Sequence, residues 1–273
     1  METPFRHAVA SFLCFSSSCV IYFYLLFSNK FLCCSILFSC CAIACIIHYV
    51  INDDSLRQVV ACSMLLGCVY AVGLYLCTKG FWRQPSCVGL YLCVLSFFHF
   101  SEFFSIALFS SKSLSTDSFL LNHSVEYWIA AISSWFEYVV ELYQFPNAKR
   151  QPLITYVGLA LVLIGEILRK AAIVNAGDCF THLVSFRRRP EHQLITNGVY
   201  SICRHPSYTG WLLWSVGTQV LLCNPICTVL YAVISWKFLA ERIRTEELLL
   251  VLFFGTKYTK YRAVVPSGIP FVR

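Results

Sequence analysis

The amino-acid sequence predicts an all-α protein, a polytopic transmembrane bundle of about eight membrane helices of which the last two form a hairpin. Of the 273 residues, 58% are hydrophobic and 13% are charged, which is about half the charged share of a soluble domain. The mean hydropathy is +0.67. Apolar runs of about 20 residues, the length that spans a bilayer as a helix, recur along the chain.

This composition excludes a soluble enzyme, a disordered chain and a secreted disulfide scaffold. The net charge of +7 fits basic residues beside membrane spans and does not indicate nucleic-acid binding. Most of the 16 cysteines lie between Cys14 and Cys93, inside apolar runs where they act as small hydrophobic residues. No Cys-x-x-Cys pair or Cys/His ligand spacing occurs, so the sequence predicts no metal site.

Four apolar stretches in the first half of the chain predict the first four helices. They are 8–28, 31–51, 58–78 and 86–110. The first is expected to be a retained span and not a cleaved signal, since the second follows within a few residues and no small-residue cleavage pattern separates them. The small residues Gly67 and Gly73, and later Gly158 and Gly165, are expected to lie at close helix contacts.

Two further apolar stretches, 124–145 and 153–174, predict the fifth and sixth helices. Carboxylates lie in or beside the predicted spans, and a carboxylate that faces lipid costs about 2.5–3.5 kcal/mol on insertion scales. We therefore expect these acids to face the bundle interior, to pair with basic groups and to serve packing. The acids are Glu102, Glu126, Glu137, Glu141 and Glu166, and their candidate partners are His99, His123, Arg169 and Lys170.

The character of the chain changes after residue 174. Residues 175–204 are polar and carry the basic run Arg187–Arg189, which cannot cross a membrane. Two short apolar stretches, 211–223 and 226–240, are joined by Asn224-Pro225, a dipeptide typical of a tight turn. At 1.5 Å per residue the first stretch is about 20 Å long, so this hairpin either inserts deeply or crosses twice with its flanks included.

The residues after the hairpin divide into two segments. Residues 241–255 alternate charge with Leu and Phe, which predicts an amphipathic helix. Gly255 is the expected stop of that helix. The tail 256–273 contains several tyrosines and prolines and is expected to be irregular.

The distribution of basic residues predicts the topology and three regions. Most of the 21 Lys and Arg residues fall on one side when eight crossings are counted, and the positive-inside rule places that side, with both termini and residues 175–204, in the cytoplasm. Residues 1–110 form membrane helices one to four, and 111–174 form helices five and six. Residues 175–273 form the catalytic region, with the cytoplasmic loop, the hairpin 211–240, the amphipathic helix and the tail.

The strongest chemical signal is the segment from Arg204 to Tyr208 (RHPSY), preceded by Tyr200 and followed by Glu246-Glu247. Proline after His205 disfavours helix before it and suits the first turn of the next helix. His205 is therefore expected at the mouth of the hairpin, where free N–H groups favour an anion. Arg242 lies four residues before Glu246 on one helix face, and an arginine can hold a carboxylate by two parallel bonds. The sequence predicts a cytoplasm-facing polar pocket at the membrane surface.

Each of these features also has a purely structural interpretation. His205 alone fits a simple helix cap. Arg242 and Glu246 alone fit an exposed ion pair, which stabilises a helix by roughly a few tenths of a kcal/mol. The Arg187–Arg189 run fits a topology and lipid-contact element more readily than a substrate site.

The residues above lie within a longer likeness to a known family. The chain resembles the isoprenylcysteine carboxyl methyltransferases, membrane enzymes that methylate the terminal carboxylate of prenylated proteins. The likeness covers most of the chain and is densest over Ser111–Ser134, in GEILRKAA from Gly165 to Ala172, and from His192 to Pro270. The last segment contains RHPSYTGW, GTQVLLCNPIC and RTEELLL. The RHPxYxG segment and the Glu pair alone indicate a broad superfamily, and the accompanying segments make the assignment specific.

The resemblance implies an S-adenosylmethionine site that is embedded in the membrane and unlike a Rossmann fold, and no Gly-rich loop after a strand occurs here. Arg242 is implied as the holder of the substrate carboxylate and so as the catalytic residue. Ser185 stands where the family carries a Gln before the basic loop FRRRPE, and it is a further candidate contact despite this departure. The cofactor contacts implied by the motifs are His192, Gln193, Leu194, Ile195, Tyr200, His205, Pro206, Ser207, Tyr208 and Glu246.

The implied reaction is attack of a carboxylate oxygen on the sulfonium methyl group, which forms a methyl ester on the prenylated cysteine of processed CaaX proteins. A C-terminal carboxylate has a pKa near 3.5 and is ionised at neutral pH, so no general base is needed. The faces of Tyr200 or Tyr208 suit the sulfonium cation. A farnesyl or geranylgeranyl chain would enter laterally from the bilayer, and the family implies the endoplasmic reticulum membrane.

Two other functions compete with methyl transfer. One is an NADPH-dependent sterol or steroid-type reductase, whose C-terminal region looks similar around a Pro-Tyr-Gly segment. The other is a transporter or channel built around the intramembrane acids. RTEE and the HQLI-to-HPSY spacing disfavour the reductase, and the absence of a detectable internal repeat or of paired broken helices disfavours the transporter. The sequence does not distinguish farnesyl from geranylgeranyl or indicate the oligomeric state.

Overall fold

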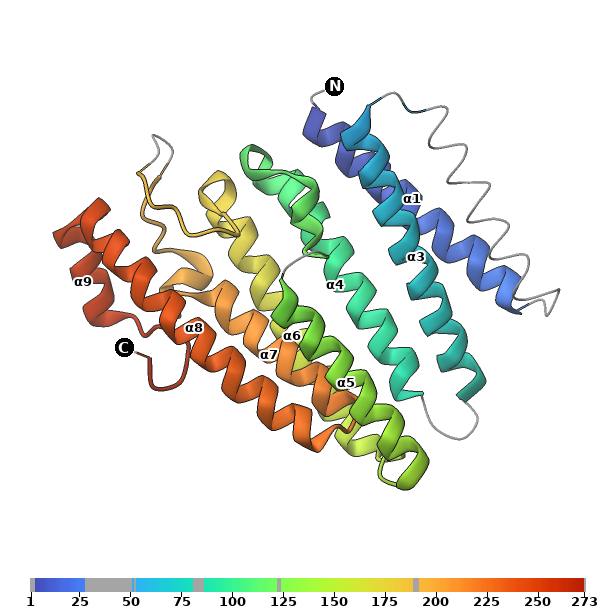
Figure 1. The fold of residues 1–273 in the computed structure, drawn as a ribbon. Coiled ribbons are helices and arrows are strands. Elements are labelled where there is room, and N and C mark those ends of the chain that lie inside the picture. Colours follow the sequence, from blue (N-terminus) through green and yellow to red (C-terminus); the bar gives the residue numbers. More distant parts are fainter. Residues whose placement is uncertain are drawn as a thin grey trace. The chain divides into compact units, whose positions relative to one another are not determined.

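Every regular element in the described part of the chain is a helix (Figure 1). The computed structural model describes residues 3–27, 51, 53–80, 86–121, 124–188 and 192–272. The all-α prediction is confirmed for these residues, whereas the predicted span 31–51 lies almost entirely outside them. The helices divide between two compact units. Unit 1 comprises Met1–Leu108 and Leu114–His123, and unit 2 comprises Phe109–Ser113 and Ser124–Arg273.

Unit 1 contains the helices that the composition marks as membrane spans. Its elements are α1 (Thr3–Phe27), α3 (Asp54–Gly80), α4 (Cys87–Phe109) and the short 3₁₀ helix η2 (Thr116–Phe119). The predicted stretches 8–28, 58–78 and 86–110 are therefore helical, with ends shifted by a few residues. Among the described residues, three segments are long and apolar enough to cross a membrane, namely Thr3–Tyr24, Asp54–Thr78 and Cys87–Phe109. The total of eight membrane helices remains a prediction.

The helices of unit 1 approach closely at small residues. A Cβ atom added at Gly67 would lie 2.6 Å from the carbonyl oxygen of Phe15, and one at Gly73 would lie 2.7 Å from the carbonyl oxygen of Gly89. The ring of Phe15 also stacks on Phe100 at a centroid distance of 4.0 Å. Both glycines are thus helix contacts, as predicted, because any larger side chain would collide with the neighbouring backbone.

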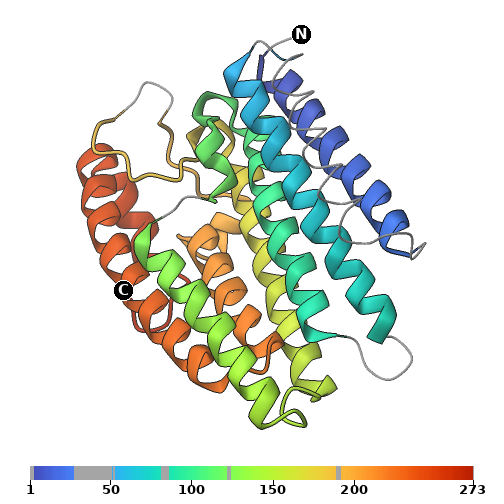
Figure 2. The ribbon, with the colours of Figure 1, turned by 45° about the vertical axis from the view of Figure 1, so that its right-hand side comes forward.

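Unit 2 places four long helices against one another and carries the predicted site. Helix α6 runs along α7, and α7 returns through a tight turn into α8 (Figures 1 and 2). The short helix α9 folds back at the far end of α8. The elements are η1 (Ser111–Ser113), α5 (Val125–Gln144), α6 (Pro152–Ala176), η3 (Gly177–Cys179), η4 (Gly198–Ser201), α7 (Pro206–Leu221), α8 (Pro225–Phe254) and α9 (Thr256–Val264).

Two element boundaries differ from the prediction. The stretch 226–240 and the amphipathic segment 241–255 form one continuous helix, α8, because no glycine or proline interrupts residues 226–254. At 1.5 Å per residue this helix is about 45 Å long, which exceeds the roughly 30 Å hydrocarbon core. Gly255 ends it with a φ of 56°, as expected of a helix stop. The tail is not irregular throughout, because residues 256–264 form α9.

Helices α6 and α7 are joined by glycines on facing sides. A Cβ atom added at Gly165 would lie 2.5 Å from the carbonyl oxygen of Gly210, and one at Gly210 would lie 2.5 Å from that of Gly165. Gly158 meets the backbone of Leu221 in the same way. The predicted contact role of Gly158 and Gly165 is therefore confirmed, and these contacts hold both ends of α7 against α6.

Polar groups hold the turn between α7 and α8 against α5. The carboxylate of Glu137 accepts the N–H groups of Ile226 and Cys227, each at 2.7 Å, at the start of α8. The ammonium of Lys149 lies 2.6 Å from Glu141 Oε2 and donates to Asn224 Oδ1, also at 2.6 Å. A buried charge is tolerated when it is paired and hydrogen-bonded in this manner.

The expectation for the acids in the predicted spans is largely, but not wholly, correct. Glu102, Glu137 and Glu166 are buried, and Glu166 pairs with Lys170 at 3.2 Å. The partner of Glu141, Lys149, was not among the predicted ones. Glu126 is an exception, because it is exposed in the first turn of α5, where a carboxylate complements the helix dipole.

Candidate active site

The segment before α7 is positioned by the end of α6. Gly198 has a φ of 58° and packs against Asn175, whose Oδ1 accepts the N–H of Val199 at 3.2 Å. The hydroxyl of Tyr200 donates to the carbonyl oxygen of Ala172 at 3.3 Å. These contacts fix η4 against the last turns of α6. The end of α6 therefore positions residues 198–208, which lead into α7.

His205 lies at the entrance of α7, as its proline neighbour predicts. Pro206 occupies the first turn, and His205 is the residue that precedes the helix. The side chain of His205 is buried and makes no capping hydrogen bond to α7. The simple-cap interpretation is therefore wrong, and the imidazole is available for a different contact.

The side chains of Arg242 and Glu246, on α8, are connected through Tyr208 of α7. Arg242 Nε donates to the Tyr208 hydroxyl at 2.8 Å, and that hydroxyl donates to Glu246 Oε2 at 2.6 Å. Burial, followed by the charge of Glu246, raises the pKa of Tyr208 above its usual value, which keeps the hydroxyl protonated. Arg242 and Glu246 are thus linked through the Tyr208 hydroxyl. Their spacing of four residues on α8 also allowed a direct, exposed ion pair, which the structure does not show between these two described residues.

Two further contacts orient Arg242. One of its Nη atoms donates to the carbonyl oxygen of His182, in the loop after α6. The guanidinium also lies over the rings of Tyr208 and Phe238, at 5.4 Å and 6.0 Å from their centroids. Arg242 therefore has a fixed orientation between the loop, α7 and the apolar side of α8.

Glu247 lies at the centre of a second, buried cluster. Its Oε1 atom accepts from Arg204 Nε at 2.8 Å and lies 3.3 Å from His205 Nε2, and its Oε2 atom is 3.1 Å from Arg262 Nε. Burial alone would raise the pKa of Glu247, but the contacts and charges of His205 and Arg204 outweigh burial and lower the pKa to about 2. Glu247 is thus ionised and joins the entrance of α7 to α8 and α9.

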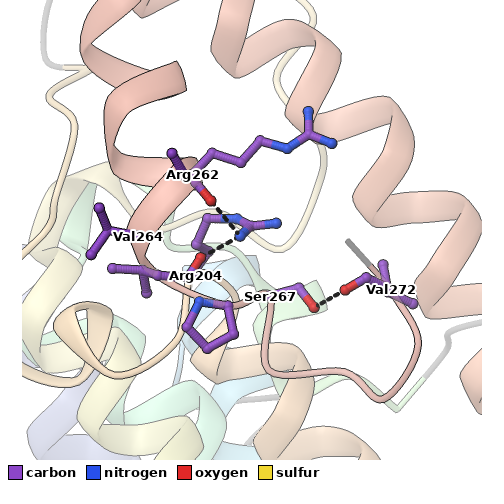
Figure 3. A pocket seen from close by; sticks show the side chains of 8 residues that line it. Arg204, Arg262, Val264, Ser267 and Val272 are labelled. Carbon is purple, nitrogen blue, oxygen red and sulfur yellow. Dashed lines mark hydrogen bonds between the residues drawn. The ribbon is translucent and has the colours of Figure 1, made fainter.

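The chain after α9 closes over the entrance of α7. The N–H groups of Arg204 and His205 donate to the carbonyl oxygens of Pro266 and Ser267, at 2.8 Å and 3.1 Å. The Arg204 guanidinium also donates to the carbonyl oxygens of Arg262 and Val265. Figure 3 shows the cavity of about 380 Å³ at this place, whose lining includes none of the predicted cofactor contacts.

The remaining predicted contacts lie at several places around the entrance of α7. Residues 192–195 have no regular structure, and the ring of His192 lies 5.9 Å from that of Phe253, two turns beyond Glu246. Ser207 is drawn to α6, because its hydroxyl accepts from Arg169 at 3.0 Å. Ser185 is half-buried and forms no hydrogen bond with another described residue. The structure thus brings together His205, Tyr208, Arg242 and Glu246 but leaves Ser185 without a link to them.

Sequence reasoning missed the second cluster and the backbone contacts. Arg204 and Glu247 both lie in the quoted motifs, but helical spacing relates only residues on one helix, and their contact joins the segment before α7 to α8. The tail contacts Arg204 and His205 through backbone carbonyl oxygens. Every residue type has a carbonyl group, so no sequence pattern predicts such contacts. The one sequence signal for the second cluster was the adjacency of Glu246 and Glu247. Neighbouring residues on a helix face different directions, so two adjacent glutamates contact different partners.

Comparison with known proteins gives consistent results. Residues 158–252 match the model of the Isoprenylcysteine carboxyl methyltransferase (ICMT) family. Over 219 residues the chain is 48% identical to the protein-S-isoprenylcysteine O-methyltransferase of Xenopus laevis, covering 80% of this chain and 75% of that protein. It is 50% identical over 179 residues to the Homo sapiens enzyme of the same name, covering 66% and 63%.

A solved structure is similar over nearly the whole chain. The structure of the eukaryotic intramembrane Ras methyltransferase ICMT aligns with a TM-score of 0.90 and 37% identity, covering 97% of this chain and 98% of that one. The comparisons do not favour the reductase or transporter alternatives.

Proposed function

Because this chain belongs to the isoprenylcysteine carboxyl methyltransferase family, we propose that it transfers a methyl group from S-adenosylmethionine to the C-terminal carboxylate of a prenylated cysteine. The observation that carries the proposal is the chain of contacts Arg242–Tyr208–Glu246. The fixed guanidinium of Arg242 suits the carboxylate of the substrate. The carboxylate of Glu246 and the ring of Tyr208 suit a cationic methyl donor.

The residues near the entrance of α7 fit such a donor. The side chain of Glu246 is 30% exposed, so one carboxylate faces the site and can accept an ammonium group. The ring of Tyr208 is stacked parallel to His205, and aromatic faces attract a cation. We propose that His192 to Ile195, Tyr200, the segment from His205 to Tyr208, and Glu246 hold S-adenosylmethionine. When bound, S-adenosylmethionine supplies the methyl group and leaves as its sulfide product.

Arg242 is proposed to hold the reacting carboxylate. The substrate carboxylate is ionised at neutral pH, so the site needs to orient it and not to deprotonate it. Among the described residues, Nη1 of Arg242 makes no hydrogen bond, while Nε and Nη2 are engaged with Tyr208 and His182. The guanidinium thus keeps a donor for the substrate while its plane stays fixed. Such positioning supplies up to roughly 7–11 kcal/mol in well-aligned reactions.

The apolar surroundings of Arg242 support a prenylated partner. Phe238 lies one turn before Arg242 on α8 and is 50% exposed. The centroid of its ring is 6.2 Å from that of Trp211. We propose that a farnesyl or geranylgeranyl chain follows this apolar side of α8 after entering from the bilayer, with its carboxylate at Arg242. The partners are then processed CaaX proteins and membrane lipid.

The membrane location also remains part of the proposal. Three candidate spans in the described residues support a multi-pass membrane protein. Family membership favours the endoplasmic reticulum, and the positive-inside rule favours cytoplasmic termini and a cytoplasmic site. The division of the chain into regions 1–110, 111–174 and 175–273 is also still a prediction.

A direct assay tests the activity. Purified full-length protein in lipid nanodiscs is given S-adenosylmethionine with a labelled methyl group and a farnesylated cysteine analogue. We expect a base-labile methyl ester that depends on the prenyl group, with unprenylated cysteine as the matched control. A folded protein that forms no such ester would overturn the proposal.

A further inference from the structure

Two adjacent glutamates on α8 have sharply different surroundings. The side chain of Glu246 is 30% exposed and contacts Tyr208, whereas that of Glu247 is 3% exposed. We propose that Glu247 is a positioning residue, which holds the imidazole of His205 and through it the ring of Tyr208. The inference rests on the proposed function, because His205 and Tyr208 belong to the proposed cofactor site.

The first step is the fixation of His205. Glu247 Oε1 lies 3.3 Å from His205 Nε2, and the same oxygen is held by Arg204 through Nε at 2.8 Å and Nη2 at 2.6 Å. The other oxygen, Oε2, is held by Arg262 at 3.1 Å. Glu247 Oε1 is therefore held by a charge-assisted hydrogen bond from Arg204 Nε, and the ion pairs with Arg204 Nη2 and Arg262 add to it. Hydrogen bonds to ionised groups are about twice as strong as neutral ones. The Nε2 atom of His205 therefore has a fixed partner, Glu247 Oε1.

The second step connects His205 to the reacting groups. The rings of His205 and Tyr208 are nearly parallel, with an interplanar angle of 8° and a centroid distance of 5.6 Å. The Tyr208 hydroxyl in turn contacts Arg242 and Glu246. A displacement of the imidazole would therefore shift the tyrosine on which both Arg242 and Glu246 depend. Glu247 acts through His205 and needs no contact with either substrate.

The variant Glu247→Gln tests this chain of contacts. It keeps the size of the side chain but removes the charge, so the carboxylate no longer holds both arginines and His205 together. We expect the affinity for S-adenosylmethionine to fall about tenfold, the loss typical of one charge-assisted hydrogen bond. The KM for the farnesylated cysteine analogue should change much less. Affinity is measured by equilibrium binding in nanodiscs, together with steady-state kinetics. Unchanged cofactor affinity would overturn the inference.

A double-mutant cycle separates positioning from general stability. If Glu247 acts through His205, the variant that combines Glu247→Gln with His205→Ala binds S-adenosylmethionine no more weakly than His205→Ala alone. A purely structural role predicts that the two losses multiply, and that result contradicts the inference. Arg244→Met is the matched control, because Arg244 is an exposed arginine on the same helix and lies outside the Glu247 cluster. We expect it to leave cofactor affinity unchanged, and an affinity loss equal to that of Glu247→Gln would count against the inference.

A second variant covers the case in which Glu247→Gln does not fold. Glu247→Asp keeps the charge for Arg204 and Arg262 but shortens the side chain by one methylene, which draws it away from His205. We expect a folded protein with the same loss of cofactor affinity, and wild-type affinity would overturn the inference. Failure of the proposed function is distinguishable, because in that case the wild-type protein forms no methyl ester.

Discussion

Arg242 illustrates how one side chain can be both fixed and available. Tyr208 and the carbonyl oxygen of His182 engage two of its nitrogens, and the rings of Tyr208 and Phe238 define the plane of the guanidinium. These contacts leave Nη1 without a hydrogen bond to a described residue. A lysine would lack the planar fork that makes this division possible.

Replacing Arg242 by alanine should abolish turnover while leaving S-adenosylmethionine binding largely intact. The reason is that, in the proposed site, Arg242 is assigned to the substrate carboxylate, whereas Glu246 and the α7 entrance are assigned to the cofactor. The measurement is methyl-ester formation beside equilibrium cofactor binding. Arg244→Ala, an exposed arginine on the same helix, is the control and should retain activity. If Arg242→Ala loses cofactor binding instead, this division of roles is wrong.

The ionisation of Glu247 gives a prediction for stability against pH. Its pKa is about 2 in the folded protein, below the roughly 4.3 of an unfolded chain. The unfolded state therefore binds more protons between these values, and the stabilisation by Glu247 is complete above about pH 5 and is lost as pH falls toward 2.

The Tm of the wild-type protein and of Glu247→Gln, compared from pH 7 to pH 3, measures this effect. We expect a constant difference down to about pH 5, which then shrinks as the carboxylate is protonated. A difference that stays constant to pH 3 would show that the charge of Glu247 is not what stabilises the cluster.

At the scale of elements, sequence patterns predicted helix positions well and helix continuity poorly. Apolar runs located α1, α3, α4, α5 and α6, because burial or lipid contact requires such runs. The break placed near residue 240 was wrong, since a change from apolar to amphipathic character alters the surroundings of a helix and not its backbone. Helix α9 was missed because its sequence, TKYTKYRAV, has little apolar surface and is held by the buried ring of Tyr258.

The contact between α6 and α7 should be sensitive to a single added methyl group. In Gly165→Ala the new Cβ would lie 2.5 Å from the carbonyl oxygen of Gly210 and 2.7 Å from the backbone nitrogen of Trp214. Backbone atoms cannot move aside as a side chain can, so we expect a destabilisation of about 1–3 kcal/mol, measured as a lower Tm in nanodiscs. Ala160→Val adds bulk at an exposed position of α6 and should have little effect. A Tm equal to the wild type in Gly165→Ala would show that the helices separate easily.

At the scale of the molecule, the sequence predicted which residues lie together but not what supports them. The motifs and the family resemblance pointed to His205, Tyr208, Arg242 and Glu246, and the structure places these side chains close to one another. Contacts between distant segments escaped prediction, as with Arg204 and Glu247, which are 43 residues apart. Such pairs depend on how α7, α8 and α9 meet, and spacing along one helix carries no information about that.

The arrangement of unit 2 leads to a prediction about topology. The proposed site lies at the start of α7 and in the second half of α8, whereas Lys149 contacts the turn between these helices at their opposite ends. The positive-inside rule predicts that the proposed site and the C-terminus face the cytoplasm and that the 145–151 turn lies on the opposite side of the membrane. An epitope tag at the C-terminus should be detected in cells whose plasma membrane alone is permeabilised, and a tag in the 145–151 turn only after full permeabilisation. Methyltransferase activity of each tagged protein controls for correct folding. A C-terminal tag that requires full permeabilisation would invert the orientation and place the proposed site away from cytoplasmic S-adenosylmethionine.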